Sequence, residues 1–397
     1  PLWWPINSAQ QAYLKCPAQL ALFGGQSGGG KMICMDELIP TPEGFVRNGD
    51  LKDGDRIFGE DCEVHTVTKA HPPRIEESFR VTFDDGTYTY VHAGHLWHTF
   101  TFQERQSIVR KTPEIRARRR ANRPSRGTGK YPWLAERNRL KALAHVPTPV
   151  LGKVRTTEEI MRTLSVNNCE RANHSIRLAK PIETPVRYLP IHPYVLGAWL
   201  GDGNSDSAIF TISRKAKIET LRTFKKCGHS LHPIRAYIGK TPKYGCYRLQ
   251  AKLKKLGVLR NKHVPDEYLW ASKEQRLQLL RGLMDTDGCC NKDGAIEFWN
   301  MNENLSRGVY QLAASLGVKP FWREGRATLY GKDCGPKFGV FWTAMLPCFT
   351  LKAKAKRLPK KLRATQAWRY IVNVEPAGLR EMRCITSSNP TGLYLFG

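Results

Sequence analysis

The sequence predicts a multidomain protein in which an all-β unit is split by an α/β unit with an internal duplication. Residues 34–103 alternate apolar and polar side chains between turn signals, and residues 366–397 return to the same strand-like pattern. Between these segments, two nine-residue stretches align position for position. The flanking segments therefore predict one β unit, and the paired stretches predict a duplicated insertion.

Composition favours a partner with many negative charges. The chain has 397 residues, 41% of them hydrophobic, and carries 63 Lys and Arg against 35 Asp and Glu, a net charge of +28. No segment approaches the roughly 18 apolar residues of a membrane span, so nucleic acid is the expected partner and a membrane is not. The eleven cysteines show no metal-ligand spacing, which fits a reduced, cytoplasmic compartment.

Residues 34–100 read as short strands joined by tight turns. Asp53-Gly54 and Asp85-Gly86 are turn dipeptides placed between alternating segments. An Arg-rich polar stretch follows from Glu104 to Lys153. Two interpretations of this stretch stay open, a solvated insertion and an arm that contacts DNA phosphates. Its candidate DNA-binding residues are Arg116, Arg118, Arg119, Arg120, Arg123, Arg126 and Lys130.

The duplicated stretches are VLGAWLGDG, which ends at Gly203, and LRGLMDTDG, which ends at Gly288. Their small residues are four apart, Gly197 and Gly201 in the first copy, and Gly282 and Thr286 in the second. This spacing puts each pair on one helical face, where backbones can approach closely.

Side-by-side packing of these helices would bring Asp202 and Asp287 together at two negative helix ends. A hard divalent cation, Mg²⁺ in the cell, would relieve the repulsion and would serve phosphodiester hydrolysis. We expect Asp202, Asp287, Gly201 and Thr286 to form the metal site, with Lys215 and Lys332 as electrostatic helpers. A lone Asp-Gly at a helix end is an ordinary C-cap, but two aligned copies favour the catalytic interpretation.

These motifs resemble the LAGLIDADG homing endonucleases, which cut double-stranded DNA. The resemblance extends over the blocks LPIHPYVLGAWLGDGNSDSAIFTIS, KHVPDEYLWASKEQRLQLLRGLMDTDG and NMNENLSRGVYQLAASLGVKP. It implies two αββαββα repeats about a pseudo-twofold axis within residues 185–345, and metal-binding catalytic roles for Asp202 and Asp287. The first motif departs from the family pattern at Leu200, where an Asp is common.

The flanking β-rich segments resemble the two halves of the Hint splicing domain of inteins. Cys34, followed by MDELIPTPEGF, resembles the first splicing block, whose thiol attacks the preceding carbonyl at Ile33 in an N-to-S acyl shift. His95 matches the histidine of the second block, which protonates the departing nitrogen, and His92 stands where a Thr is usual. Cys384 in REMRCITSS resembles the residue that assists both cleavage steps.

The expected closing His-Asn pair and the nucleophile after it are absent from the sequence, so splicing is expected to be incomplete in the chain as written. No cofactor is expected for splicing itself.

Residues 1–31 contain a partial phosphate-binding loop. GxxxxGK includes Gly25, Gly30 and Lys31, but Met32 follows where Ser or Thr would hold Mg²⁺. The segment resembles the start of a phage terminase large subunit, which implies that the intein interrupts a terminase phosphate loop. Alone, this remnant is not expected to hydrolyse ATP.

The preferred interpretation is therefore a splicing domain with an embedded, Mg²⁺-dependent DNA endonuclease, monomeric and covalently joined to host terminase segments in a bacterial cytoplasm. Two alternatives are a decayed endonuclease that only binds DNA and a fragment of a terminase ATPase. The expected segments are 1–33 (host), 34–103 (first splicing half), 104–184 (basic insert), 185–345 (endonuclease), 346–365 (basic linker) and 366–397 (second splicing half).

Overall fold

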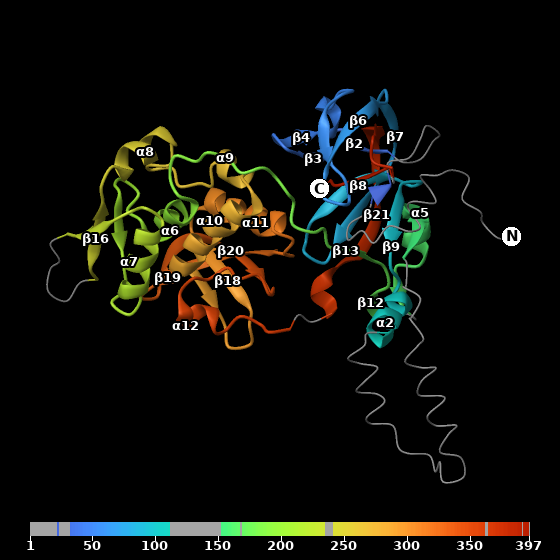
Figure 1. Ribbon diagram of the computed structural model, residues 1–397. Helices are drawn as coiled ribbons and strands as arrows, with labels where there is room; N and C mark the ends of the chain where they lie inside the picture. Colours follow the sequence, from blue (N-terminus) through green and yellow to red (C-terminus); the bar gives the residue numbers. More distant parts are fainter. Residues whose placement is uncertain are drawn as a thin grey trace, which may run out of the picture.

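The computed structural model describes residues 22–23, 32–111, 152–166, 169–234, 241–361, 364–390 and 392–396. Over these residues the chain forms two lobes, one rich in β-strands and one of mixed α/β structure (Figure 1). None of the helices described is both long and apolar enough to span a membrane. The predicted phosphate-loop and arm residues lie outside the described residues: Gly25, Gly30, Lys31, Arg116, Arg118, Arg119, Arg120, Arg123, Arg126 and Lys130.

The β lobe is built from both ends of the described chain. Its first part comprises β1 (Leu22–Phe23), β2 (Ile33–Cys34), β3 (Leu38–Thr41), β4 (Gly44–Arg47), the 3-10 helix η1 (Asn48–Asp50), β5 (Arg56–Phe58), β6 (Val64–Ala70), β7 (Arg74–Phe83), β8 (Tyr88–His92), β9 (Leu96–Thr99), α2 (Phe102–Lys111), β10 (Lys153–Thr156), α5 (Thr157–Arg162), β11 (Ser165–Val166), β12 (Cys169–Ala172) and β13 (Ser175–Arg177). Its last part comprises η2 (Ala364–Ala367), β21 (Trp368–Arg383), β22 (Ile385–Ser387) and β23 (Leu393–Tyr394).

The long strand β21 joins the two parts of this lobe into one structure. It lies in a five-stranded sheet of order β13-β21-β2-β8-β7 and also pairs directly with β7. The terminal strands β22 and β23 pair with β6 and β1. Because strands distant in sequence share these sheets, the β unit is split as predicted.

Residues 152–177 belong to the β lobe, although the sequence placed them in a basic insert spanning 104–184. β10 pairs with β9, and β13 pairs with β21. These strands have only three or four residues each. The alternation of apolar and polar side chains in them is therefore too short to be recognised next to an Arg-rich sequence.

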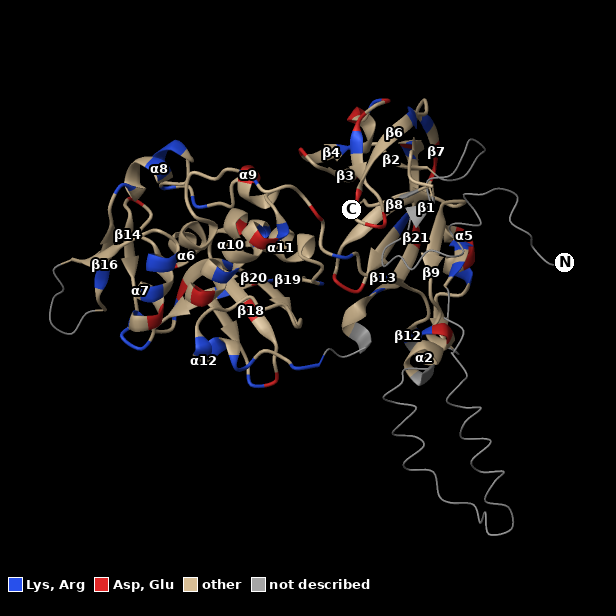
Figure 2. Cartoon of the chain, in the orientation of Figure 1, with Lys and Arg blue, Asp and Glu red and all other residues tan. Residues whose placement is uncertain are grey.

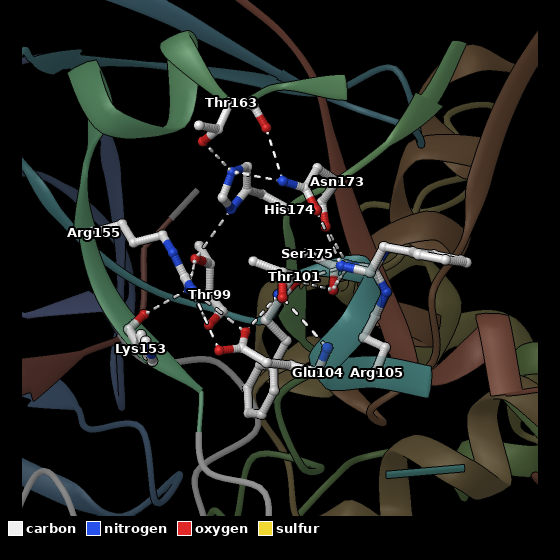
Figure 3. A network of polar contacts seen from close by, with 12 residues as sticks. Thr99, Thr101, Glu104, Arg105, Lys153, Arg155, Thr163, Asn173, His174 and Ser175 are labelled. Atoms are coloured by element: carbon white, nitrogen blue, oxygen red, sulfur yellow. Dashed lines mark hydrogen bonds and ion pairs between the residues drawn. The ribbon is translucent and has the colours of Figure 1, made fainter. Parts of the chain in front are cut away.

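Buried polar contacts fix this segment to β9 and α2 (Figure 3). Arg105 donates to the carbonyls of Phe100 and Asn173, each at 2.7 Å. The ring of His174 lies between the hydroxyls of Thr163, at 2.8 Å, and Thr99, at 3.5 Å. Burial lowers the pKa of His174 to about 4, so the ring is neutral at pH 7. The base of the Arg-rich stretch is therefore rigidly held.

The α/β lobe contains two related halves. The first comprises α6 (Pro193–Asp202), β14 (Ile209–Thr211), α7 (Lys217–Lys226), β15 (Leu231–Pro233), β16 (Lys243–Cys246) and α8 (Leu249–Lys255). After α9 (Asp266–Leu269), the second comprises α10 (Lys273–Thr286), β17 (Gly288–Cys290), β18 (Ile296–Asn300), α11 (Glu303–Ser315), β19 (Phe321–Leu329), β20 (Lys332–Trp342) and α12 (Lys352–Ala355). The sheets have the orders β14-β16-β15 and β17-β18-β20-β19.

The helices α6 and α10 lie side by side at the centre of this lobe (Figure 1). A Cβ added at Gly282 would lie 2.6 Å from the backbone nitrogen of Ala198, and one added at Gly197 would lie 3.0 Å from that of Leu283. Only glycine allows the two backbones to approach this closely, as the four-residue spacing predicted.

The lobes contact each other through a buried ion pair and an aromatic contact. Lys319 of the α/β lobe lies 2.5 Å from Asp84 of the β lobe and donates to the carbonyl of Trp368 at 2.8 Å. Trp270 packs edge-on against Phe45, with ring centroids 5.2 Å apart. The two lobes are therefore joined by packing as well as by covalent linkers.

Candidate functional site

Asp202 and Asp287 stand at the ends of the two central helices. Asp202 is the last residue of α6, and Asp287 is the C-cap of α10. Each helix start is fixed locally, α6 by Pro193 at its first position and α10 by a capping box from Ser272. A Cβ added at Gly201, next to Asp202, would lie only 3.5 Å from the carboxyl carbon of Asp287. The two motif acids therefore meet, as predicted.

The electrostatics of this pair show an acidic site that is only partly neutralised. Burial, followed by the neighbouring charge of Asp202, raises the pKa of Asp287 to about 6, against the opposing effects of Lys262, Asn300 and Lys354. Burial also raises the pKa of Asp202, while Lys354 and Lys262 lower it. Additional positive charge at this place would stabilise both carboxylates.

Lys262 covers the carbonyl end of α6. Its ammonium donates to the carbonyls of Gly201, at 3.0 Å, and Gly203, at 2.7 Å, and lies 5.1 Å above the ring of Trp199. A cation at this position complements both the helix dipole and the nearby carboxylates.

Lys354 covers the carbonyl end of α10 in the same way. Its ammonium donates to the carbonyls of Met284 at 2.9 Å, Asp285 at 2.7 Å, Thr286 at 3.1 Å and Gly288 at 2.7 Å. Lys354 comes from the short helix α12, in the stretch that the sequence interpretation treated as a basic linker. Each half of the lobe thus supplies one lysine to its own motif helix.

Sequence reasoning chose Lys215 and Lys332 as helpers and missed Lys262 and Lys354. Lys215 is exposed ahead of α7, and Lys332 is exposed at the first residue of β20. The charges that act on Asp202 and Asp287 are instead those of Lys262 and Lys354. The sequence contains no signal that separates these two lysines from the other lysines near them.

The donor set fits a hard divalent cation. The side chains of Asp202 and Asp287 interact electrostatically, and carboxylate oxygens are ligands that hard divalent cations prefer. The backbone carbonyls of the predicted ligands Gly201 and Thr286 accept hydrogen bonds from Lys262 and Lys354. The Thr286 hydroxyl donates to carbonyls of its own helix, those of Gly282 and Leu283, so it is not a free ligand. Asp202 and Asp287 would hold the ion, and the amide of Asn300, 3.2 Å from Asp287, orients the second carboxylate.

The predicted splicing residues surround the short strand β2. Ile33 pairs with Val91 of β8 on one side and with Arg383 of β21 on the other. The buried amide of Asn48 donates to the carbonyls of Ile33, at 3.3 Å, and Cys34, at 3.4 Å. The Ile33–Cys34 peptide is therefore held in the middle of a sheet.

The two predicted thiols differ in their surroundings. Cys34 is 6% exposed and pairs with Met382, whereas Cys384 is half-buried just beyond β21. Burial, followed by the effect of Cys384, raises the pKa of Tyr394 in β23 well above its ordinary value. The end of β21 and the last strand therefore lie close to each other.

His92 and His95 form the turn between β8 and β9. The backbone amide of His92 donates to the carbonyl of Met32 at 3.1 Å, and that of His95 donates to the carbonyl of His92 at 2.9 Å. The buried ring of His95 lies edge-on to Trp97, at 5.1 Å, and to Phe396, at 6.0 Å. This turn thus contacts both the start of the β unit and its final residues.

Comparison with protein families gives one match inside the α/β lobe. Residues 274–333, which include the second motif and Asp287, match the family described as LAGLIDADG-like domain. The fold class is that of a multidomain chain in which an all-β unit is split by a duplicated α/β unit, and the second half of that α/β unit carries the LAGLIDADG-like match.

The curated relatives are helicases. The chain is 30% identical over 379 residues to the replicative DNA helicase DnaB of Mycobacterium intracellulare, covering 94% of this chain and 58% of that protein. A DnaB of Mycobacterium leprae is 30% identical over 84 residues, 21% of this chain and 14% of that protein. The chain thus spans little more than half the length of the Mycobacterium intracellulare protein. These relatives do not support the predicted terminase host, since both are helicases.

Two solved structures are similar to parts of the chain. The crystal structure of the MchDnaB-1 intein is 31% identical and covers 17% of this chain and 52% of its own, with a TM-score of 0.17. A homing endonuclease I-DmoI variant, solved with its target DNA and Mn, is 14% identical and covers 38% of this chain and 86% of its own, with a TM-score of 0.27.

The mutual repulsion of the motif acids predicts a measurable effect. In the metal-free protein, substituting Asp202→Asn removes the like charge, so the pKa of Asp287 falls below about 6 but stays raised by burial. The affinity of the wild-type chain for divalent cations weakens as pH falls through about 6, because protons then compete for Asp287. Carboxyl NMR titration measures the first effect and calorimetry the second. An unchanged Asp287 pKa in the Asp202→Asn chain would contradict the proximity of the two acids.

Proposed function

We propose that the α/β lobe is a divalent-metal-dependent endonuclease that cuts double-stranded DNA at a specific site, with Mg²⁺ as the cellular ion. The observation that carries this proposal is the meeting of Asp202 and Asp287 at the ends of α6 and α10, each helix end covered by its own lysine. The repeated architecture supplies one half-site for each DNA strand.

The residues of this chain have distinct tasks in that reaction. When bound, the ion would supply Lewis acidity toward a phosphodiester oxygen and the leaving oxyanion. Asp202 and Asp287 hold the ion, while Lys262 and Lys354 place positive charge beside the pair and stabilise the negative charge that builds up on the phosphate. Lys and Arg on α7, α8 and α12 add attraction for the DNA backbone (Figure 2).

We further propose that the β lobe carries out thiol-dependent protein splicing. In the assignment from sequence, the Cys34 sulfur bonds to the carbonyl carbon of Ile33, the amide bond breaks, and the released nitrogen takes a proton from His95. The product is a thioester, which a second nucleophile can displace. Cys384 assists this step and the later one.

A second assignment gives the first attack to Cys384. It is favoured by the burial of Cys34 within β2, a strand paired on both sides, where its amide cannot rotate without breaking the sheet. Cys384 lies at a strand end and is more accessible. Both assignments keep His95 as the proton donor.

The host context remains part of the proposal. Residues 1–31 resemble a terminase phosphate loop, whereas the relatives are DnaB helicases. The GxxxxGK pattern that ends at Lys31 is typical of a phosphate loop. We therefore propose covalent attachment to a phosphate-loop ATPase, with the terminase large subunit as the specific candidate, and a monomeric chain in a phage-infected bacterial cytoplasm.

The nuclease proposal predicts loss of cutting without loss of binding. Supercoiled plasmids carrying insertion-free phosphate-loop sequences of terminase and DnaB genes are incubated with the chain and Mg²⁺. Asp287→Asn should slow cutting by about 100-fold or more while gel-shift affinity stays within about threefold, because the metal ligand and not the DNA surface is altered. Asp206→Asn, an exposed acid paired with Arg260, is the matched control. Undiminished cutting by Asp287→Asn would exclude this mechanism, and binding without wild-type cutting would favour a decayed, DNA-binding module.

The splicing proposal predicts thiol-induced release of the N-terminal segment. With dithiothreitol added to the chain, mass spectrometry should detect a fragment ending at Ile33, and Cys384→Ala should slow its release at least about tenfold under either assignment. Loss of release in Cys34→Ala assigns the first attack to Cys34. Retained release assigns it to Cys384. Cys289→Ala, an exposed thiol in the other lobe, is the control, and normal release in both test variants would contradict thiol catalysis.

A further inference from the structure

The two motif helices are related by sequence, but at one buried position an apolar side chain in one helix corresponds to an acid in the other. Leu200 of α6 aligns with Asp285 of α10, two residues before the metal-binding acid in each case. Leu200 is completely buried and packs in the hydrophobic core, whereas Asp285 is a 7%-exposed carboxylic acid. A buried acid at one half-site and an alkyl side chain at the other require different surroundings.

The carboxylate of Asp285 accepts hydrogen bonds from the segment that begins α12. The backbone amide of Thr350 donates to its two oxygens at 2.9 and 3.2 Å, and that of Leu351 donates at 3.1 Å. The hydroxyl of Tyr194 in α6 donates at 3.0 Å. One side chain therefore ties α6, α10 and the start of α12 together.

This connection fixes where Lys354 lies. Leu351 is the N-cap of α12, and Lys354 follows within the single turn of that helix. Because α12 has only four residues, its own hydrogen bonds cannot hold it in place, and external contacts must. Besides Asp285, the carboxylate of Glu219 accepts from the backbone amide of Lys352 at 2.9 Å.

The first half-site is held differently. The main chain of Lys262 is fixed by the side chain of Asn302, whose amide donates to the Lys262 carbonyl at 2.7 Å. The side chain of Lys262 also packs over Trp199, which precedes Leu200. No acid equivalent to Asp285 is therefore needed in α6.

We propose that Asp285 is a positioning residue that anchors α12 so that the Lys354 ammonium covers the end of α10, and that this support serves one half-site only. The inference rests on the proposed nuclease function and deepens it. Loss of Asp285 weakens the half-site that contains Lys354 and leaves the one that contains Lys262 intact, so the two DNA strands are cut at unequal rates.

Chemical labelling tests the positioning without any nuclease assay. The full chain is treated with an acetylating reagent, and the modification of each lysine is followed by mass spectrometry. Asp285→Ala should raise the labelling rate of Lys354 about tenfold, toward that of the exposed neighbours Lys352 and Lys356, because the anchor of α12 is lost. Lys262 should be unchanged. Asp285→Asn, which keeps a carbonyl oxygen facing the amides of Thr350 and Leu351, should stay near wild type.

Plasmid nicking tests the consequence for the reaction. Asp285→Ala should cut the first strand within about twofold of wild type and the second about tenfold more slowly, so that nicked circles accumulate, and Asp285→Asn should restore linear product. Lys354→Met should reproduce the nicking of Asp285→Ala. The double variant should be no slower than either single one, because both changes remove the same support.

Four results would each overturn the inference. In the labelling experiment these are an unchanged rate for Lys354 in Asp285→Ala, or a rate for Lys262 that rises as much as that of Lys354. In either experiment Asp285→Asn could be as impaired as Asp285→Ala, and in the nicking experiment Asp285→Ala could slow the cutting of both strands equally. If the wild-type chain cuts neither plasmid, the nuclease proposal fails, and the labelling result alone decides whether Asp285 positions Lys354.

Discussion

The close approach of α6 and α10 is the constraint on which the rest of the α/β lobe depends. Gly197 and Gly282 lack the side chains that would separate the two backbones, and the helices end at Asp202 and Asp287, whose charges act on each other. This arrangement is electrostatically unfavourable on its own, since burial and like charge raise the pKa of Asp287 to about 6. The positive charges of Lys262 and Lys354 offset part of this unfavourable interaction, because both lower the pKa values of the two acids.

The β lobe depends on a different kind of constraint, the sharing of one long strand between distant segments. β21 pairs with β7, β2 and β13, so the sheet is complete only when the segments on either side of the α/β lobe come together. The same pairing places the end of β21, with Cys384, next to β2, with Cys34. The ion pair between Lys319 and Asp84 connects the inserted α/β lobe to the β lobe. The two lobes are therefore held together by a direct contact as well as by the chain segments that join them.

Much of this architecture follows from local sequence patterns, and the parts that do not follow depend on contacts between distant residues. The spacing of Gly197, Gly282, Asp202 and Asp287 gave the helices, their packing and the acidic pair. Nothing local distinguishes Lys354 from other lysines of its basic stretch, because its role depends on a four-residue helix anchored to Asp285. The strands of residues 153–177 were missed for a similar reason. They are short, and β9 and β21 hold them in place.

In the proposed nuclease, two acids, one from each repeat, share one divalent cation at the helix ends. Diffraction from crystals of the chain with Mn²⁺ and a bound DNA duplex tests this most directly, because manganese is located by its anomalous scattering. We expect manganese to be coordinated by a carboxylate oxygen of Asp202 and one of Asp287. Manganese bound elsewhere, or carboxylates that separate and bind no metal, would contradict it.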